Sequence, residues 1–136
     1  MKNRTLAGDY VVRARNRLAA LDVLFEKKSY ADVVREAQEL VELALNGLLR
    51  FSDIEVPRIH DVSQVMEDQL SLLPPEVHAA VPELGKISRE LRRDRELAFY
   101  GSEDLTPSEF YREDDATKAR NQARWVVEQV SNALKI

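Results

Sequence analysis

The segment Tyr30–Phe51 has the sequence YADVVREAQELVELALNGLLRF, the clearest helical pattern in the chain. Its apolar residues recur at three- and four-residue steps and are Val34, Ala37, Val41, Ala44, Leu45 and Leu48. This spacing places them on one face of an α-helix, so the sequence predicts a long amphipathic helix. The preceding segment, Leu6–Lys28, has the same pattern, with Val11, Ala14, Leu18, Leu21 and Phe25. The short connection that follows Lys28, where Ser29 can cap the second helix, predicts an antiparallel pair.

The rest of the chain continues the helical pattern. Three further helices are predicted, over Asp61–Leu73, Pro82–Tyr100 and Ala116–Leu134, the last capped by Asp114 or Asp115. Thr106 and Glu109 form a capping box that starts a single turn, Pro107–Tyr111. No useful length shows the alternation of a strand. We therefore expect one all-α domain over residues 1–136, an antiparallel up-and-down bundle of four main helices plus short helices.

The composition excludes several classes of function. The chain has 136 residues and no cysteine, which rules out disulfides, thiolate nucleophiles and cysteine-bound metals. No apolar run reaches the roughly 20 residues of a membrane span, and the N-terminus is too polar for a signal peptide. Together these features predict a cytoplasmic protein without a membrane partner. The net charge of −4 argues against a bulk nucleic-acid coat protein, and we expect no DNA partner.

Charged residues gather in two neighbouring tracts. Lys86–Glu96 holds five basic residues, namely Lys86, Arg89, Arg92, Arg93 and Arg95. Ser102–Asp115 holds six acidic residues. One interpretation is a solvated helix face with ion pairs, followed by an acidic loop. The other is an arginine cluster that binds phosphate, because the planar guanidinium donates two parallel hydrogen bonds. Asp94 and Arg95 also lie on or beside the apolar stripe of their helix, where charges either pair across an interface or line a cleft.

The segment Pro57–Val62 contains one of the two histidines, His60. It is either a residue at a helix start, next to a favourably placed Asp61, or a general base or phosphate donor. The chain has no pair of histidines at metal-ligand spacing and no glycine-rich phosphate loop. We therefore expect no metal and no cofactor.

In this order, the segments resemble those of HEPN-domain proteins over about Leu6–Leu134. Tyr30–Leu49 resembles the family's second helix, and Pro57–Val62 resembles its Pro-x-x-His-Asp segment. Arg95–Gly101, the acidic loop and Tyr111–Ala116 resemble the end of stand-alone archaeal and bacterial members. The resemblance implies a helical bundle that is usually a homodimer. Many members are metal-independent endoribonucleases, and others bind nucleotides or accompany a minimal nucleotidyltransferase in a toxin–antitoxin pair.

The ribonuclease members carry an Arg-x4–6-His motif near the end of the penultimate long helix. Arg95 matches the arginine, but Tyr100 stands where the histidine is expected. Because a phenol ordinarily titrates near pH 10 and an imidazole near about 6.5, tyrosine is a poor general base at neutral pH. It can still donate a hydrogen bond to a phosphate or stack on a base. Five residues turn an ideal helix by about 140°, so Arg93 rather than Arg95 would share a face with Tyr100.

The residues that we single out as candidates follow from this resemblance and from the arginine tract. Arg95 and Tyr100 are the candidate catalytic residues, and Arg92, Arg93, Arg95 and His60 are candidate phosphate-binding residues for a nucleotide or RNA. Three hypotheses remain open. The chain is a binding and assembly module, an active endoribonuclease toxin in which His60 replaces the missing base, or a structural protein without a site. Under all three a homodimer is expected, with Trp125, Tyr10 and Phe99 as interface aromatics or with Trp125 packed inside its own chain.

Overall fold

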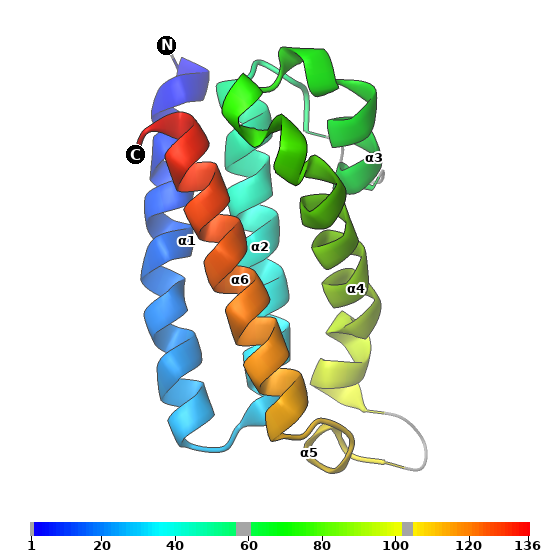
Figure 1. Cartoon of the computed structure of the whole chain (residues 1–136). Helices are drawn as coiled ribbons and strands as arrows, with labels where there is room; N and C mark the ends of the chain where they lie inside the picture. Colours follow the sequence, from blue (N-terminus) through cyan, green and yellow to red (C-terminus); the bar gives the residue numbers. More distant parts are fainter. Residues whose placement is uncertain (1, 57–60, 102–104) are drawn as a thin grey trace.

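A computed structural model describes residues 2–56, 61–101 and 105–136, with side chains except at 2, 3 and 95–99. Figure 1 shows long helices running side by side, with short helices near the ends of the bundle. The long helices are α1 (Lys2–Glu26), α2 (Tyr30–Phe51), α4 (Val81–Tyr100) and α6 (Glu113–Leu134). The short ones are α3 (Val62–Asp68), α5 (Pro107–Phe110) and two 3-10 turns, Leu70–Leu72 and Pro75–Ala80. The all-α expectation is confirmed.

Helix α2 is the centre of the bundle and begins and ends where the sequence predicts. It packs against α1, α4 and α6, and Figure 1 shows α1 and α2 running in opposite directions. Its predicted apolar face is buried throughout, from Val34 to Leu48. Gly47 lets α1 approach closely, because a Cβ at this position would lie 3.3 Å from the carbonyl oxygen of Ala7. Helix α4, which carries the arginine tract, packs against another side of α2.

Several predicted boundaries were wrong. The expected helix Asp61–Leu73 is α3 followed by a separate 3-10 turn, with Asp61 as the cap of α3. Helix α6 begins at Glu113, before the predicted start, because the Asp115 carboxylate accepts the Arg112 backbone N–H at 2.9 Å from inside the first turn. The hydroxyl of Ser29 donates to the Asp32 carboxylate and makes no cap hydrogen bond to the backbone.

Other local predictions are confirmed. Thr106 and Glu109 form the capping box of α5, with hydrogen bonds of 3.2 and 3.3 Å. Trp125 is partly buried against the core of its own chain, as one of the two alternatives had it. The side chain of Phe99 lies outside the described residues. Among the residues that the structure places, no helix combines the length and the apolar character that crossing a membrane requires.

Candidate functional site

Helix α4 carries the arginine tract, and its consecutive residues point to different neighbours because they are about 100° apart on the helix. Arg92 turns towards α2 and the start of α3, whereas Arg93 lines a groove against α6. Tyr100 ends the helix with 77% of its surface exposed. The side chain of Arg95 and the whole of His60 lie outside the described residues. The structure therefore places Arg92 and Arg93 in separate surroundings.

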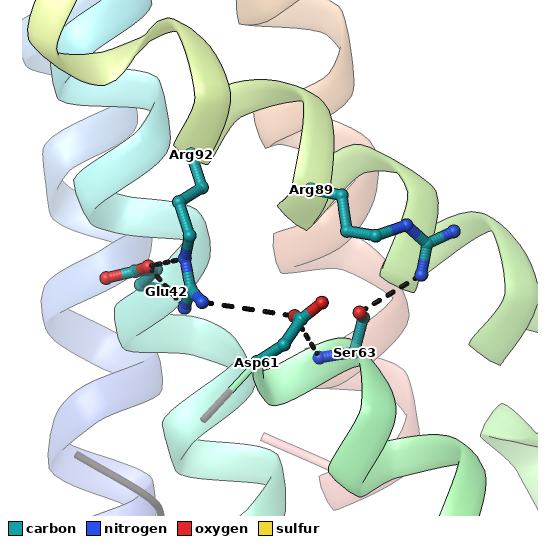
Figure 2. A network of polar contacts seen from close by, with 5 residues as sticks. All are labelled: Glu42, Asp61, Ser63, Arg89 and Arg92. Atoms are coloured by element: carbon teal, nitrogen blue, oxygen red, sulfur yellow. Dashed lines mark hydrogen bonds and ion pairs between the residues drawn. The ribbon is translucent and has the colours of Figure 1, made fainter. Parts of the chain in front are cut away.

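Arg92 belongs to a polar network that joins three helices (Figure 2). Its Nη2 and Nε donate to Oε1 of Glu42 on α2 at 2.9 and 3.2 Å. Its Nη1 lies 4.0 Å from Oδ1 of Asp61. Asp61 caps α3 by accepting the backbone N–H of Ser63 at 2.9 Å, and the Ser63 hydroxyl accepts Arg89 Nη1 at 3.0 Å. The guanidinium of Arg92 is thus paired with carboxylates of its own chain and links α4 to α2 and to the start of α3. We call Arg92, Glu42 and Asp61 the clasp.

The clasp also sets the charge state of Asp61. Partial burial raises the pKa of this carboxyl, but the hydrogen bonds from Ser63 and the charges of Arg92 and Arg89 together outweigh it. The pKa of Asp61 is therefore lowered from its ordinary value. A carboxyl with a lowered folded-state pKa stabilises the fold above its unfolded-state pKa of about 3.9, and this contribution is lost as the pH falls through the folded-state value.

Replacing Asp61 with asparagine tests this clasp. Asparagine retains the helix cap, so the change removes mainly the charge. Because 39% of the Asp61 side chain is exposed, solvent screening limits the expected loss to about 1 kcal/mol or less at about pH 7. The loss should be smaller at an acidic pH well below 3.8, because the contribution disappears as the pH falls through the lowered folded-state pKa of the wild-type carboxyl. Urea denaturation at both pH values measures it, with Asp68→Asn as the control at the other end of α3. An equal loss at both pH values would contradict the electrostatic explanation.

Arg93 lies at a groove of about 190 Å³ between α4 and α6. Its Nε is 3.7 Å from Oδ1 of Asp94, and 74% of its side chain is exposed. The Tyr111 hydroxyl donates to the backbone oxygen of Asp94 at 3.1 Å and closes one side of the groove. Asp94 lines this groove, as one of the two alternatives for a charge beside the apolar stripe had it.

The interior of this groove disfavours additional negative charge. Burial raises the pKa of Asp94, and the neighbouring carboxylates of Asp115 and Glu90 add to the effect against the opposing charge of Arg93. Burial, followed by the charges of Asp94 and Asp115, raises the pKa of Tyr111 to about 12. A phosphate is therefore compatible with the exposed guanidinium at the mouth of the groove and incompatible with its acidic floor. In the part of the chain with described side chains, no group of acidic or histidine residues is arranged to hold a metal ion.

The comparison with family models identifies the class of protein to which this bundle belongs. Residues 7–133 match the HEPN domain, which covers nearly the whole chain. The chain therefore belongs to the HEPN domain family. No curated protein and no solved structure matches it.

Sequence reasoning missed Glu42 and Ser63, which accept hydrogen bonds from Arg92 and Arg89 of α4, respectively. In the sequence, neither residue differs from the other polar residues of its segment. The signal that could have found Glu42 is its place on α2 at the edge of the apolar stripe, where a long cation from a neighbouring helix can reach it. The segment that contains Ser63 was predicted as helix, but its distance from α4 depends on the bundle geometry.

Proposed function

We propose that this HEPN domain is a module that binds the phosphates of a nucleotide or single-stranded RNA at the second half of α4, and that it lacks ribonuclease chemistry. The observation that carries the proposal is the exposed guanidinium of Arg93 at the mouth of a groove. Among the described side chains, its ion pair is with the adjacent Asp94 at 3.7 Å, and 74% of its side chain is exposed, so its donors remain accessible to a ligand. Arg95 and His60 are proposed to complete the phosphate site, whereas Arg92 acts mainly through the clasp.

The proposed loss of catalysis rests on Tyr100. This residue occupies the position at which the ribonuclease members have histidine, and its side chain is exposed at the end of α4. In the proposal the phenol donates a hydrogen bond to a phosphate or stacks on a base, and it takes no proton from the 2′-hydroxyl. The alternative function is a metal-independent endoribonuclease toxin that uses Arg95 and Tyr100. It is favoured by their five-residue spacing, which falls within the family motif.

The proposed partners are a second copy of the chain and a minimal nucleotidyltransferase of a toxin–antitoxin pair. The family resemblance supports both. A shallow groove of about 430 Å³ between α4 and α6, lined by Ile87 and Trp125 among others, supplies apolar surface for such contacts. Light scattering should give a molar mass of twice the 15.6 kDa of one chain. A monomer at all accessible concentrations would remove the homodimer from the proposal.

Changing Arg93 to alanine tests the phosphate site. Loss of one charge-assisted contact should weaken binding to a fluorescently labelled single-stranded RNA by about tenfold or more. Arg124→Ala is the matched control, because Arg124 is also exposed and also pairs with one carboxylate, Asp22, at 3.4 Å. It should bind RNA as the wild type does. Equal affinities of the two variants would contradict the assignment of Arg93, and absence of binding by the wild type to RNA and to nucleotides would contradict the function.

A further inference from the structure

A second set of arginines lies on the face shared by α1 and the end of α2, and aromatic rings hold it in place. The guanidinium carbon of Arg4 lies 4.6 Å from the centre of the Phe51 ring. Those of Arg50 and Arg13 lie 5.6 and 5.9 Å from the centre of the Tyr10 ring. We call these five residues the arginine–aromatic patch. None of them belongs to the phosphate site proposed on α4.

The partners of these arginines differ from those of other arginines in the bundle. Arg17 lies 3.5 Å from Glu39, and Arg120 lies 3.3 Å from Asp22, so their charges are balanced within the chain. In the described part of the chain, the contacts of Arg4 and Arg50 are with rings rather than with carboxylates.

Within the part of the chain that the structure describes, Arg50 and Arg13 also make few contacts that would neutralise their positive charges. The Nε atom of Arg50 is buried with no hydrogen-bond partner among the described residues. Arg13 has a carboxylate neighbour, Asp9, but at 3.7 Å and with both side chains about half exposed. Such an exposed, solvent-screened ion pair neutralises little of the charge of Arg13. The patch is therefore a local excess of positive charge on a protein whose net charge is −4.

A cation–π contact leaves a guanidinium able to bind phosphate. The ring attracts the positive charge without using an N–H donor, so the N–H groups remain able to donate two parallel hydrogen bonds. Guanidinium planes and aromatic rings also stack on unpaired bases, whereas bases inside a duplex are not accessible in this way. Arginines interleaved with aromatic rings therefore fit a single strand better than a duplex.

We infer that the arginine–aromatic patch is a second contact surface for single-stranded RNA, an inference that rests on the proposed function of the domain. The patch binds the sugar–phosphate backbone through Arg4, Arg13 and Arg50. Figure 1 shows that the N-terminus of α1 and the end of α2 lie at one end of the bundle, and that α4 ends at the other. Helix α4 has 20 residues and is therefore about 30 Å long. A mononucleotide at the α4 site does not reach the patch, but an RNA strand does.

The double variant Arg4→Ala plus Arg50→Ala tests the inference. Its control is Arg15→Ala plus Arg124→Ala, which removes the same charge from arginines that contact Ser131 and Asp22. Fluorescence anisotropy measures binding to a single-stranded RNA long enough to span the bundle, over a series of salt concentrations. The patch variant should bind RNA about tenfold more weakly than the control. Its log–log salt slope should be shallower by about 1.4, because two phosphate contacts are lost. Binding of a mononucleotide should be unchanged.

A second variant, Arg4→Lys plus Arg50→Lys, separates charge from geometry. Lysine keeps the charge and loses the planar fork, so an intermediate RNA affinity is expected. Thermal unfolding followed by circular dichroism confirms that each variant is folded. RNA affinity of the alanine variant equal to that of the control would overturn the inference. A second result would also overturn it: the wild type binds anionic phospholipid vesicles, and the alanine variant loses this binding but keeps its RNA binding.

The two proposals fail separately in these experiments. An effect of the patch variant without an effect of Arg93→Ala contradicts the α4 site and retains the patch. An effect of Arg93→Ala without an effect of the patch variant retains the α4 site and removes the patch.

Discussion

Replacing Leu48 with alanine should lower the free energy of unfolding by about 3 to 5 kcal/mol. Leu48 is fully buried on α2, the helix that contacts the three other long helices. Removing its side chain leaves a cavity that such a packed centre fills only in part. Urea denaturation of the two proteins measures the difference.

The control for this experiment is Leu72→Ala. Leu72 has 55% of its surface exposed, so its truncation should change stability by less than about 1 kcal/mol. Similar losses at Leu48 and Leu72 would contradict the central position of α2.

Replacing Gly101 with alanine should lower the free energy of unfolding by about 2 to 3 kcal/mol and should also weaken RNA binding. Gly101 ends α4 with a φ of 81°, in the left-handed region that favours glycine. An added Cβ would lie 2.8 Å from the carbonyl oxygen of Leu105 and 2.8 Å from Cδ of Pro107. Relief requires a shift of α5 or of the last turn of α4, which carries Tyr100.

Urea denaturation and RNA anisotropy on the same protein sample test this prediction. Gly8→Ala is the control, because its Cβ would meet only a methyl group of Ile136 at an ordinary 3.8 Å. It should leave both stability and RNA affinity close to those of the wild type. Full RNA affinity in a strongly destabilised Gly101→Ala protein would show that the end of α4 does not contribute to binding.

The sequence contains most of the information about the fold, because the long helices have period, start and stop signals that agree. The bounds of α2 were predicted to the residue. The errors arose where two local choices have similar free energies. Asp115 can act as a cap or as an acceptor inside the first turn, and the structure has the second arrangement. The segment after Asp68 remains apolar, but it continues as a 3-10 turn rather than as α3.

The candidate site could be predicted only as a set of residue types. The sequence shows that α4 is rich in arginine, but which arginine is free depends on what its neighbours supply. Glu42 is far from Arg92 in sequence and pairs with it at 2.9 Å, whereas Arg93 faces a groove against α6. These surroundings depend on the relative rotation of the helices, which apolar periodicity fixes only approximately. The arginine–aromatic patch could not be predicted from the sequence either. Arg4, Tyr10 and Arg50 are scattered along the chain, and only the packing of α1 on α2 brings them together.

The proposed function, RNA binding without cleavage, is tested by incubating end-labelled single-stranded RNA with the wild type and with Arg95→Ala in EDTA. Gels then separate bound, free and cleaved RNA. We expect intact, retarded RNA with the wild type, weaker retardation with Arg95→Ala, and cleavage with neither. Metal-free cleavage by the wild type that disappears in Arg95→Ala would refute the proposed function and would make the chain a ribonuclease that works without the family's histidine.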